Sequence, residues 1–238
     1  MSEKSLTIIE LPQLALAFIP VLAVLLIQFK WSLSQKGTVQ ALIRMLVQLL
    51  LVGFFLSYIF ESNSAWLVLV LLTFMVIFSS WIALNNIEAP KGKLFQRAVL
   101  AISLSGLSTL FIITQGVLQL SPWYQSQTII PLAGMVFASS MNSISLSGER
   151  FYSELANNSS YVQARNIAFQ ASMIPNVNAL LAVGVVSLPG MMTGQILSGI
   201  SPFIAARYQI MVMCMIFASA GISSAYFLYL NKPKLSSN

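Results

Sequence analysis

The sequence predicts an all-α, polytopic membrane protein, and two observations lead to this fold class. Of the 238 residues 57% are hydrophobic and only 8% are charged, whereas a soluble domain carries about 25% charged residues. Stretches of about 20 mostly apolar residues, the length that crosses the hydrocarbon core of a bilayer, recur from one end of the chain to the other. We therefore expect residues 1–238 to form a single transmembrane domain.

Seven stretches are long and apolar enough to be expected as membrane-spanning helices. The first is expected to remain in the mature protein, because no small-residue cleavage site follows it. Each span ends where a polar connection begins, and the first five connections read KWSLSQKGTVQAL, ESNS, NNIEAPKGKLFQR, SPWYQSQT and SGERFYSELANNSSYVQAR. The expected spans are 11–29, 43–60, 65–84, 98–120, 129–146, 167–186 and 208–230.

The sixth connection has a different character, because it combines helix breakers with apolar residues. It contains VVSLPGMMTGQILSG, residues 185–199, in which Pro189 and Gly190 interrupt any helix. Irregular backbone at membrane depth is tolerated only where protein or a water-lined cavity satisfies its polar groups. We expect a broken or re-entrant segment before the last span, the alternative being a plain extracellular loop.

The distribution of basic residues predicts the orientation of the chain. Ten of the 12 lysines and arginines fall in the first, third and fifth connections, within two residues of them, or after the last span, and basic residues concentrate on the cytoplasmic side of a membrane. We therefore expect the N-terminus outside and the C-terminus in the cytoplasm. The net charge of +6 follows from this asymmetry and from contact with anionic lipid, so no nucleic-acid partner is expected.

The composition argues against an enzyme. The chain has no histidine and no aspartate, which excludes HExxH zinc sites, Ser-His dyads and aspartyl dyads. It also lacks the G-x-x-x-x-G-K-[ST] loop that binds nucleotide phosphates. We expect no cofactor on this chain, and any ATP-driven step requires another polypeptide.

Metal ligands cannot be assigned from the sequence. None of the six glutamates lies in the middle of an expected span, so a tight iron site with oxygen ligands inside the membrane is not expected. The 11 methionines and Cys214 offer sulfur ligands for a soft ion, but methionine also fills irregular gaps in cores. Both interpretations of these residues stay open.

Polar residues inside the fifth expected span are candidates for a functional path. Ser139, Asn142 and Ser143 follow the i, i+3, i+4 spacing of one helical face. Serines also let helices pack closely and form hydrogen bonds between them. For Asn142 the sequence leaves two interpretations open, helix packing and a role in a transport path.

Three segments resemble the permease subunit of the FetB-type ABC transporters. They read IIPLAGMVFASSMNSISLSGERF, MIPNVNALLAVGVVSLPGMMTGQILSG and ARYQIMVM. Bacterial members of that family are associated with iron export and plant relatives with aluminium tolerance. The resemblance implies a permease of a bacterial inner membrane that works as a homodimer with two ATPase subunits, which bind ATP and Mg. It also implies a transport path or dimer seam formed by Ser140, Met141, Asn142, Ser187, Leu188, Pro189, Gly190, Met191, Met192, Thr193 and Gly194.

The fifth connection would then be the surface that docks the ATPase. Its expected docking residues are Glu149, Arg150, Phe151, Tyr152, Glu154 and Leu155, since aromatic residues and arginine are common at interface hot spots. The same residues also fit a hairpin that rests in the lipid headgroups. This connection leaves little room for a separate coupling helix, so the alternative function is a permease-like protein without an ATPase, acting as an assembly or regulatory partner or as a passive transporter.

Overall fold

The protein is described by a computed structural model that covers residues 9–61 and 64–232. These residues form helices and no β-strand, apart from one isolated bridge between Val183 and Ser187. The chain divides into two compact units, one that ends at Glu61 and one that follows it. The predicted all-α fold class is confirmed, whereas the single transmembrane domain stays a prediction.

The first unit is a helical hairpin preceded by a short helix. It consists of α1 (Leu11–Leu16), α2 (Ile19–Lys30) and α3 (Lys36–Glu61). The break between α1 and α2 lies at Ala17 and Phe18, within the turn before Pro20, because proline has no backbone N–H to donate to the Leu16 carbonyl. The side chain of Gln35 donates to the Leu25 carbonyl at 2.7 Å, which ties the start of α3 to α2.

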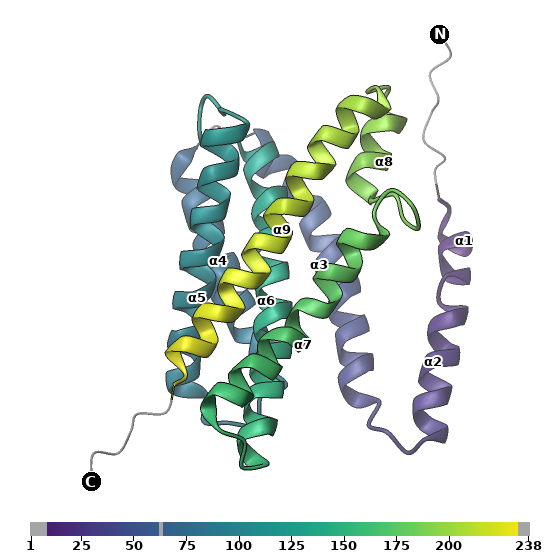
Figure 1. Cartoon of the computed structure of the whole chain (residues 1–238). Coiled ribbons are helices and arrows are strands. Elements are labelled where there is room, and N and C mark those ends of the chain that lie inside the picture. The colour runs from purple at the N-terminus through teal and green to yellow at the C-terminus, as the bar shows by residue number, and fades with distance from the viewer. Residues whose placement is uncertain (1–8, 62–63, 233–238) are drawn as a thin grey trace. The chain divides into compact units, whose positions relative to one another are not determined.

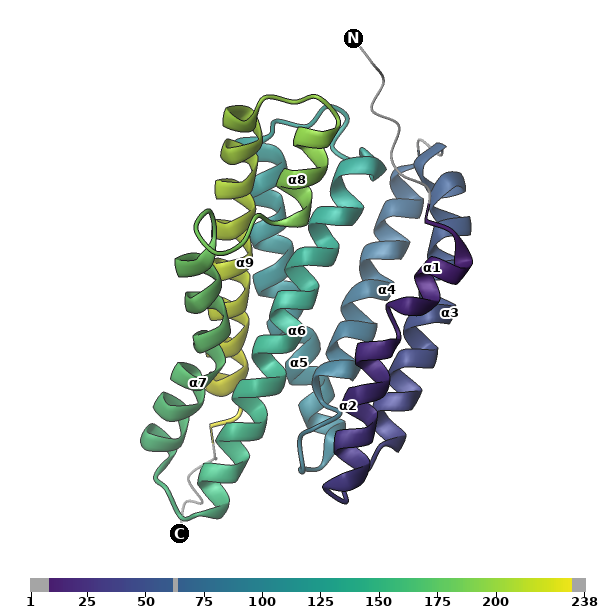
Figure 2. The same cartoon turned by 90° about the vertical axis from the view of Figure 1, so that its right-hand side faces the viewer.

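The second unit is a bundle in which α9 crosses three other helices. Figures 1 and 2 show α9 lying against α5, α6 and α7, with the short helix α8 beside its first half. Its core contains the large buried side chains Phe137, Met215 and Phe227. The helices are α4 (Ala65–Ala83), α5 (Lys91–Phe111), the π-helical turn η1 (Ile112–Val117), α6 (Ser126–Ala156), α7 (Tyr161–Ala182), α8 (Gly190–Leu197) and α9 (Pro202–Leu230).

Serine hydroxyls join the helices of this bundle. Ser105 on α5 and Ser140 on α6 both donate to the Ser219 carbonyl of α9, at 2.9 and 3.3 Å. The hydroxyls of Ser172 on α7 and Ser224 on α9 lie 3.0 Å apart. Small residues let membrane helices approach closely, so most of these serines serve helix packing.

Six of the described helical segments are long and apolar enough to cross a membrane. They are Leu11–Lys30, Lys36–Glu61, Ala65–Ala83, Lys91–Val117, Ser126–Ala156 and Pro202–Leu230. Each overlaps one expected span, so the chain is an integral membrane protein. The expected span at 167–186 corresponds to α7, which has 22 residues but is less apolar because it carries Arg165, Asn166, Gln170, Asn176 and Asn178.

Basic residues of the second unit gather at one end of its bundle. This end contains the start of α5, the α6–α7 hairpin and the end of α9 (Figure 1). Six basic residues lie there, whereas Arg207 lies near the start of α9 at the opposite end. The asymmetry matches the charge pattern of the sequence, and the assignment of this end to the cytoplasm stays a prediction. The six are Lys91, Lys93, Arg97, Arg150, Arg165 and Lys232.

Candidate functional site

The three consecutive residues expected at the path differ in their surroundings. Ser140 is completely buried and donates to the Ser219 carbonyl, so it joins α6 to α9. Met141 is half-buried against the core. Asn142 is exposed and lines a cavity between α6, α7 and α9. Of the three, Asn142 therefore has the position expected of a path residue.

This polar cavity has a volume of about 280 Å³. Ser139 and Ser143 line it beside Asn142, on the face expected from their spacing, and α7 contributes Ser172 and Asn176. The Ser143 hydroxyl is buried, with 1% of the residue exposed, and has no hydrogen-bond partner among the described residues. A buried hydroxyl without a partner costs about 1–3 kcal/mol, so the cavity is suited to water or a polar cargo.

Sequence reasoning missed the α7 side of this cavity. Pro175 also lines it, and as a proline inside α7 it removes one backbone hydrogen bond of the helix there. The polar and helix-breaking residues close together at 175–178, within an otherwise apolar stretch, are the signal that could have indicated it.

The segment 187–194 does not line the polar cavity. Ser187 and Leu188 are exposed, and Pro189 lies immediately before α8, where Thr193 donates to its carbonyl at 3.2 Å. Met192 lines a separate cavity between α7, α8 and α9. Of the expected path residues, Asn142 therefore lines the polar cavity and Met192 lines a different one within the second unit.

Phe151 is buried, which corrects its expected position as a docking side chain on the surface. It has no exposed area and packs with Ala164, Ala168 and Leu228. Its ring meets that of Tyr161 nearly edge-on, with 6.0 Å between centroids. The cause is that α6 continues as a helix to Ala156 and α7 folds back along it, so that α7 and the end of α9 cover the inner face of the last turns of α6.

Asn231 ties the other helix ends together beside Phe151. Its side-chain oxygen accepts hydrogen bonds from Arg97 of α5 at 2.7 Å and from the Tyr152 hydroxyl of α6 at 3.0 Å. The Tyr161 hydroxyl of α7 donates to the Leu228 carbonyl at 3.3 Å. Tyr152 is thus also engaged within the unit.

The outer side of the hairpin remains accessible. Glu149 and Arg150 are exposed, and Arg150 forms an ion pair with Glu154 at 2.7 Å. Glu154 also accepts a hydrogen bond from Ser159 at 3.0 Å, and Leu155 is half-buried. Docking of an ATPase here stays a prediction, with Glu149 and Arg150 as its accessible charges.

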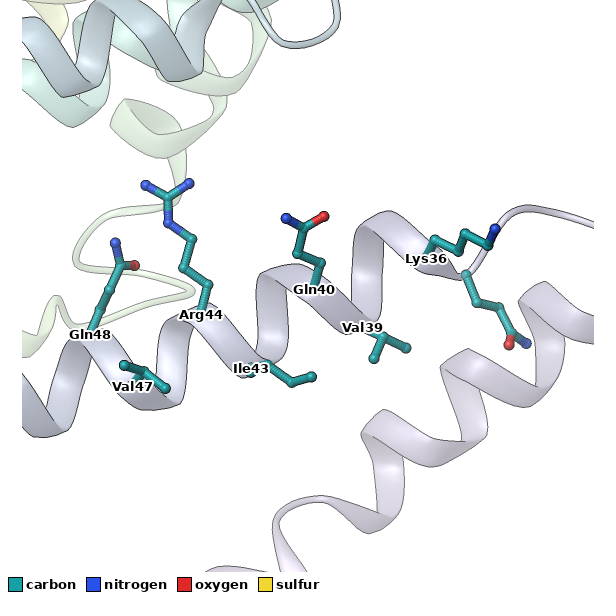
Figure 3. Close-up of a pocket in the computed structure, with 8 residues that line it drawn as sticks. Lys36, Val39, Gln40, Ile43, Arg44, Val47 and Gln48 are labelled. Carbon is teal, nitrogen blue, oxygen red and sulfur yellow. The ribbon is translucent and has the colours of Figure 1, made fainter.

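Another groove, whose lining residues all belong to the first unit, combines a polar stripe on α3 with Val39, Ile43 and Val47 of the same helix. Lys36, Gln40, Arg44 and Gln48 recur every four residues, so they lie along one face of the helix. Figure 3 shows Gln40, Arg44 and Gln48 extending to the same side. The groove has a volume of about 700 Å³. Ionisable residues in spans usually face protein or water, and the four-residue spacing could have indicated this stripe from the sequence.

No acidic metal site is found in the described part of the chain. Within residues 9–61 and 64–232, no three His, Cys, Asp or Glu side chains lie close enough together to hold a metal ion. No described glutamate lines the polar cavity or the cavity between α7, α8 and α9.

Comparison with known proteins identifies relatives of nearly the same length. Residues 11–235 match the family described as uncharacterised protein family UPF0014. A UPF0014 membrane protein of Synechocystis is 35% identical over 196 residues, which cover 76% of each chain. The probable iron export permease protein FetB of Escherichia coli is 33% identical over 93% of this chain and 90% of its own. Protein ALUMINUM SENSITIVE 3 of Arabidopsis thaliana is 28% identical over 92% and 85% of the two chains.

No solved structure matches the chain significantly. The sequence comparisons confirm the resemblance noted from the SLPGMMTG and SSMN segments, because the matches extend through both. With its family match spanning both units and its set of apolar helices, the chain belongs to the UPF0014 family of membrane proteins.

Proposed function

We propose that the chain is the permease subunit of an ABC transporter that exports metal ions such as iron. Its work is driven by ATP, which a separate cytosolic ATPase subunit hydrolyses with Mg. Two copies of the chain pair as a homodimer in a bacterial inner membrane. Support comes from the relative named as a probable iron export permease, which aligns with 93% of this chain.

The polar cavity is the structural observation that carries the proposal. Asn142 and Asn176 place amide groups between apolar helices, and Ser143 adds a hydroxyl that has no hydrogen-bond partner among the described residues. Polar groups within the membrane usually face protein or a water-filled path. A cavity that is lined by several polar side chains and is large enough for several waters could hold a polar cargo on its way through the membrane.

Co-purification tests the ATPase partnership. The tagged full chain is purified in mild detergent, its partners are identified by mass spectrometry, and ATP hydrolysis by the complex is measured. We expect nucleotide-binding subunits to co-purify, and Glu149→Lys with Arg150→Glu to release them. Phe151 is unsuitable for this test because its substitution disturbs the interior.

Arg207→Glu is the matched control. Arg207 is also an exposed cation, but it lies near the start of α9, away from the hairpin. The control should keep both the partner and ATP hydrolysis. A wild-type protein that purifies without any ATPase and without hydrolysis would overturn the proposal in favour of a permease-like protein with no motor.

A second experiment tests the cavity itself. Asn142→Leu replaces an amide by an apolar side chain of similar size, and cells that depend on this protein should then accumulate iron during iron excess. Asn178→Leu is the control, because Asn178 is exposed on α7 and does not line the cavity. Equal iron contents in cells with the two variants would contradict a role of the polar cavity in the transport path.

A further inference from the structure

Another cavity of the bundle combines sulfur-containing side chains with an apolar wall. It lies between α7, α8 and α9 and has a volume of about 320 Å³. Met192 of α8 lines it together with Gln209, Met213 and Cys214 of α9. Most of the other lining residues are aliphatic, and no carboxylate is among them.

Gln209 indicates that the cavity holds a ligand. Only 5% of this residue is exposed, and its side-chain oxygen has no hydrogen-bond partner among the described residues. An amide oxygen buried in this way costs free energy unless something satisfies it. A water needs several polar partners, whereas the wall of this cavity is almost entirely apolar or sulfur.

The sulfur-containing residues come from two helices that pack against each other, and Cys214 is the exposed one among them. Gln209 and Met213 are four residues apart on α9, so they share a face, and Cys214 follows directly. Met192 approaches from α8, which packs against the first half of α9 (Figure 2). Thioether and thiolate sulfur are soft ligands that suit Cu(I), and thiolate also binds zinc, whereas carboxylate, carbonyl and water oxygens suit harder ions.

We propose that this cavity binds a soft monovalent metal ion of the Cu(I) or Ag(I) type. The ligands are the sulfur atoms of Met192, Met213 and Cys214, and the amide oxygen of Gln209 faces the cation as a weaker, harder donor. On binding, the S–H bond of Cys214 breaks, an S–metal bond forms and the proton passes to water. No oxidant or reductant is required.

Charge explains why the ion should be monovalent. One thiolate balances one positive charge, and the two thioethers and the amide are neutral. A divalent or trivalent ion would leave uncompensated charge among apolar helices, which is costly. The idea that the bound ion is transported rests on the proposed transport function. Binding itself is independent of any ATPase.

Competition for Cu(I) tests the site directly. The purified full chain is titrated with Cu(I), kept reduced by ascorbate, against bicinchoninate, whose colour reports the copper it retains. Cys214 is the only cysteine of the chain, so protection of this thiol from a maleimide gives a second readout at the same position. We expect one Cu(I) per chain and a protected thiol.

Two pairs of methionine substitutions separate the proposed site from binding by the thiol alone. Met192→Leu with Met213→Leu removes both thioethers, and the affinity for Cu(I) should fall at least tenfold. Met191→Leu with Met211→Leu changes two neighbouring methionines that do not line the cavity, and the affinity should not change. Equal affinities of the two pairs, or equal protection of the thiol by Fe(II), would overturn the site.

The transport proposal can fail separately. If the protein binds copper but purifies without an ATPase, the metal site is supported and the proposal of ATP-driven transport is contradicted. A complex that hydrolyses ATP but binds no copper would keep the transporter and overturn this inference.

Discussion

Gly106 lets helix α5 lie directly against α6. A Cβ atom there would come within 2.6 and 2.8 Å of two ring carbons of Phe137. We expect Gly106→Ala to lower the free energy of unfolding by about 1–3 kcal/mol, the usual cost of overpacking a core. Unfolding of the purified protein in mixed detergent micelles measures the change.

The same helix provides the control. Gly92, near the start of α5, has no atom within 4 Å of the position that a Cβ would take. Gly92→Ala should therefore be neutral or stabilise the protein by up to about 1 kcal/mol, because alanine favours a helix over glycine. A similar loss of stability in both variants would contradict the close approach at Gly106.

Ser143 allows stability and function to be separated. Because its hydroxyl has no partner among the described residues, Ser143→Ala should leave the stability unchanged or raise it by about 1 kcal/mol, while it lowers transport. Ser140→Ala should instead cost about 0.6 kcal/mol, the mean for hydrogen bonds between membrane helices, since it removes the bond to the Ser219 carbonyl. Unfolding assays measure the stability of both variants, and export assays measure their transport.

At this scale the sequence predicts which residues are polar within a span, but not what each one contacts. The i, i+3, i+4 spacing placed Ser139, Asn142 and Ser143 on one face, and all three line the polar cavity. The burial of Phe151 was not predictable in this way, because it depends on how α7 folds back along α6. An aromatic residue at a helix end fits a core, a headgroup layer and an interface equally well.

The α6–α7 hairpin is the element that Phe151 stabilises. Phe151→Ala should cost about 3–5 kcal/mol, as other large-to-small substitutions in cores do, and should lower the yield of folded protein in size-exclusion chromatography. Val162→Ala is the control on the same hairpin, because Val162 is 53% exposed and should change the stability little. A fully stable Phe151→Ala variant would contradict the packing described for this hairpin.

Apolar stretches predicted the helices better than they predicted the helix ends. Hydropathy marks the part of a helix that crosses lipid, so the expected span at 129–146 corresponds to a helix that extends over Ser126–Ala156. The start of α7 carries a local signal that hydropathy does not use, because Ser160 and Gln163 form a capping box there. The polar stripe of α3 was missed, since Lys36 was assigned to a connection and Arg44 was counted with its basic residues, whereas α3 already begins at Lys36.

For the whole molecule, the charge asymmetry predicts which ends face the cytoplasm. In a Cys214→Ser background, Asn158→Cys at the α6–α7 hairpin should react with a membrane-impermeant maleimide only after the cells are opened. Ser198→Cys, which follows α8, should react in intact cells. Both positions are exposed, and the reverse pattern of labelling would invert the orientation.

The junction at Asn231 has a mechanical consequence. The side-chain oxygen of Asn231, at the end of α9, accepts hydrogen bonds from both α5 and α6. We therefore expect these three helix ends to move together when the hairpin moves. Bending must then occur further along the helices, where a proline has removed a backbone hydrogen bond, at Pro131 in α6 and Pro175 in α7. Pro175 lines the polar cavity, so we expect any rocking motion of the hairpin to change the width of that cavity.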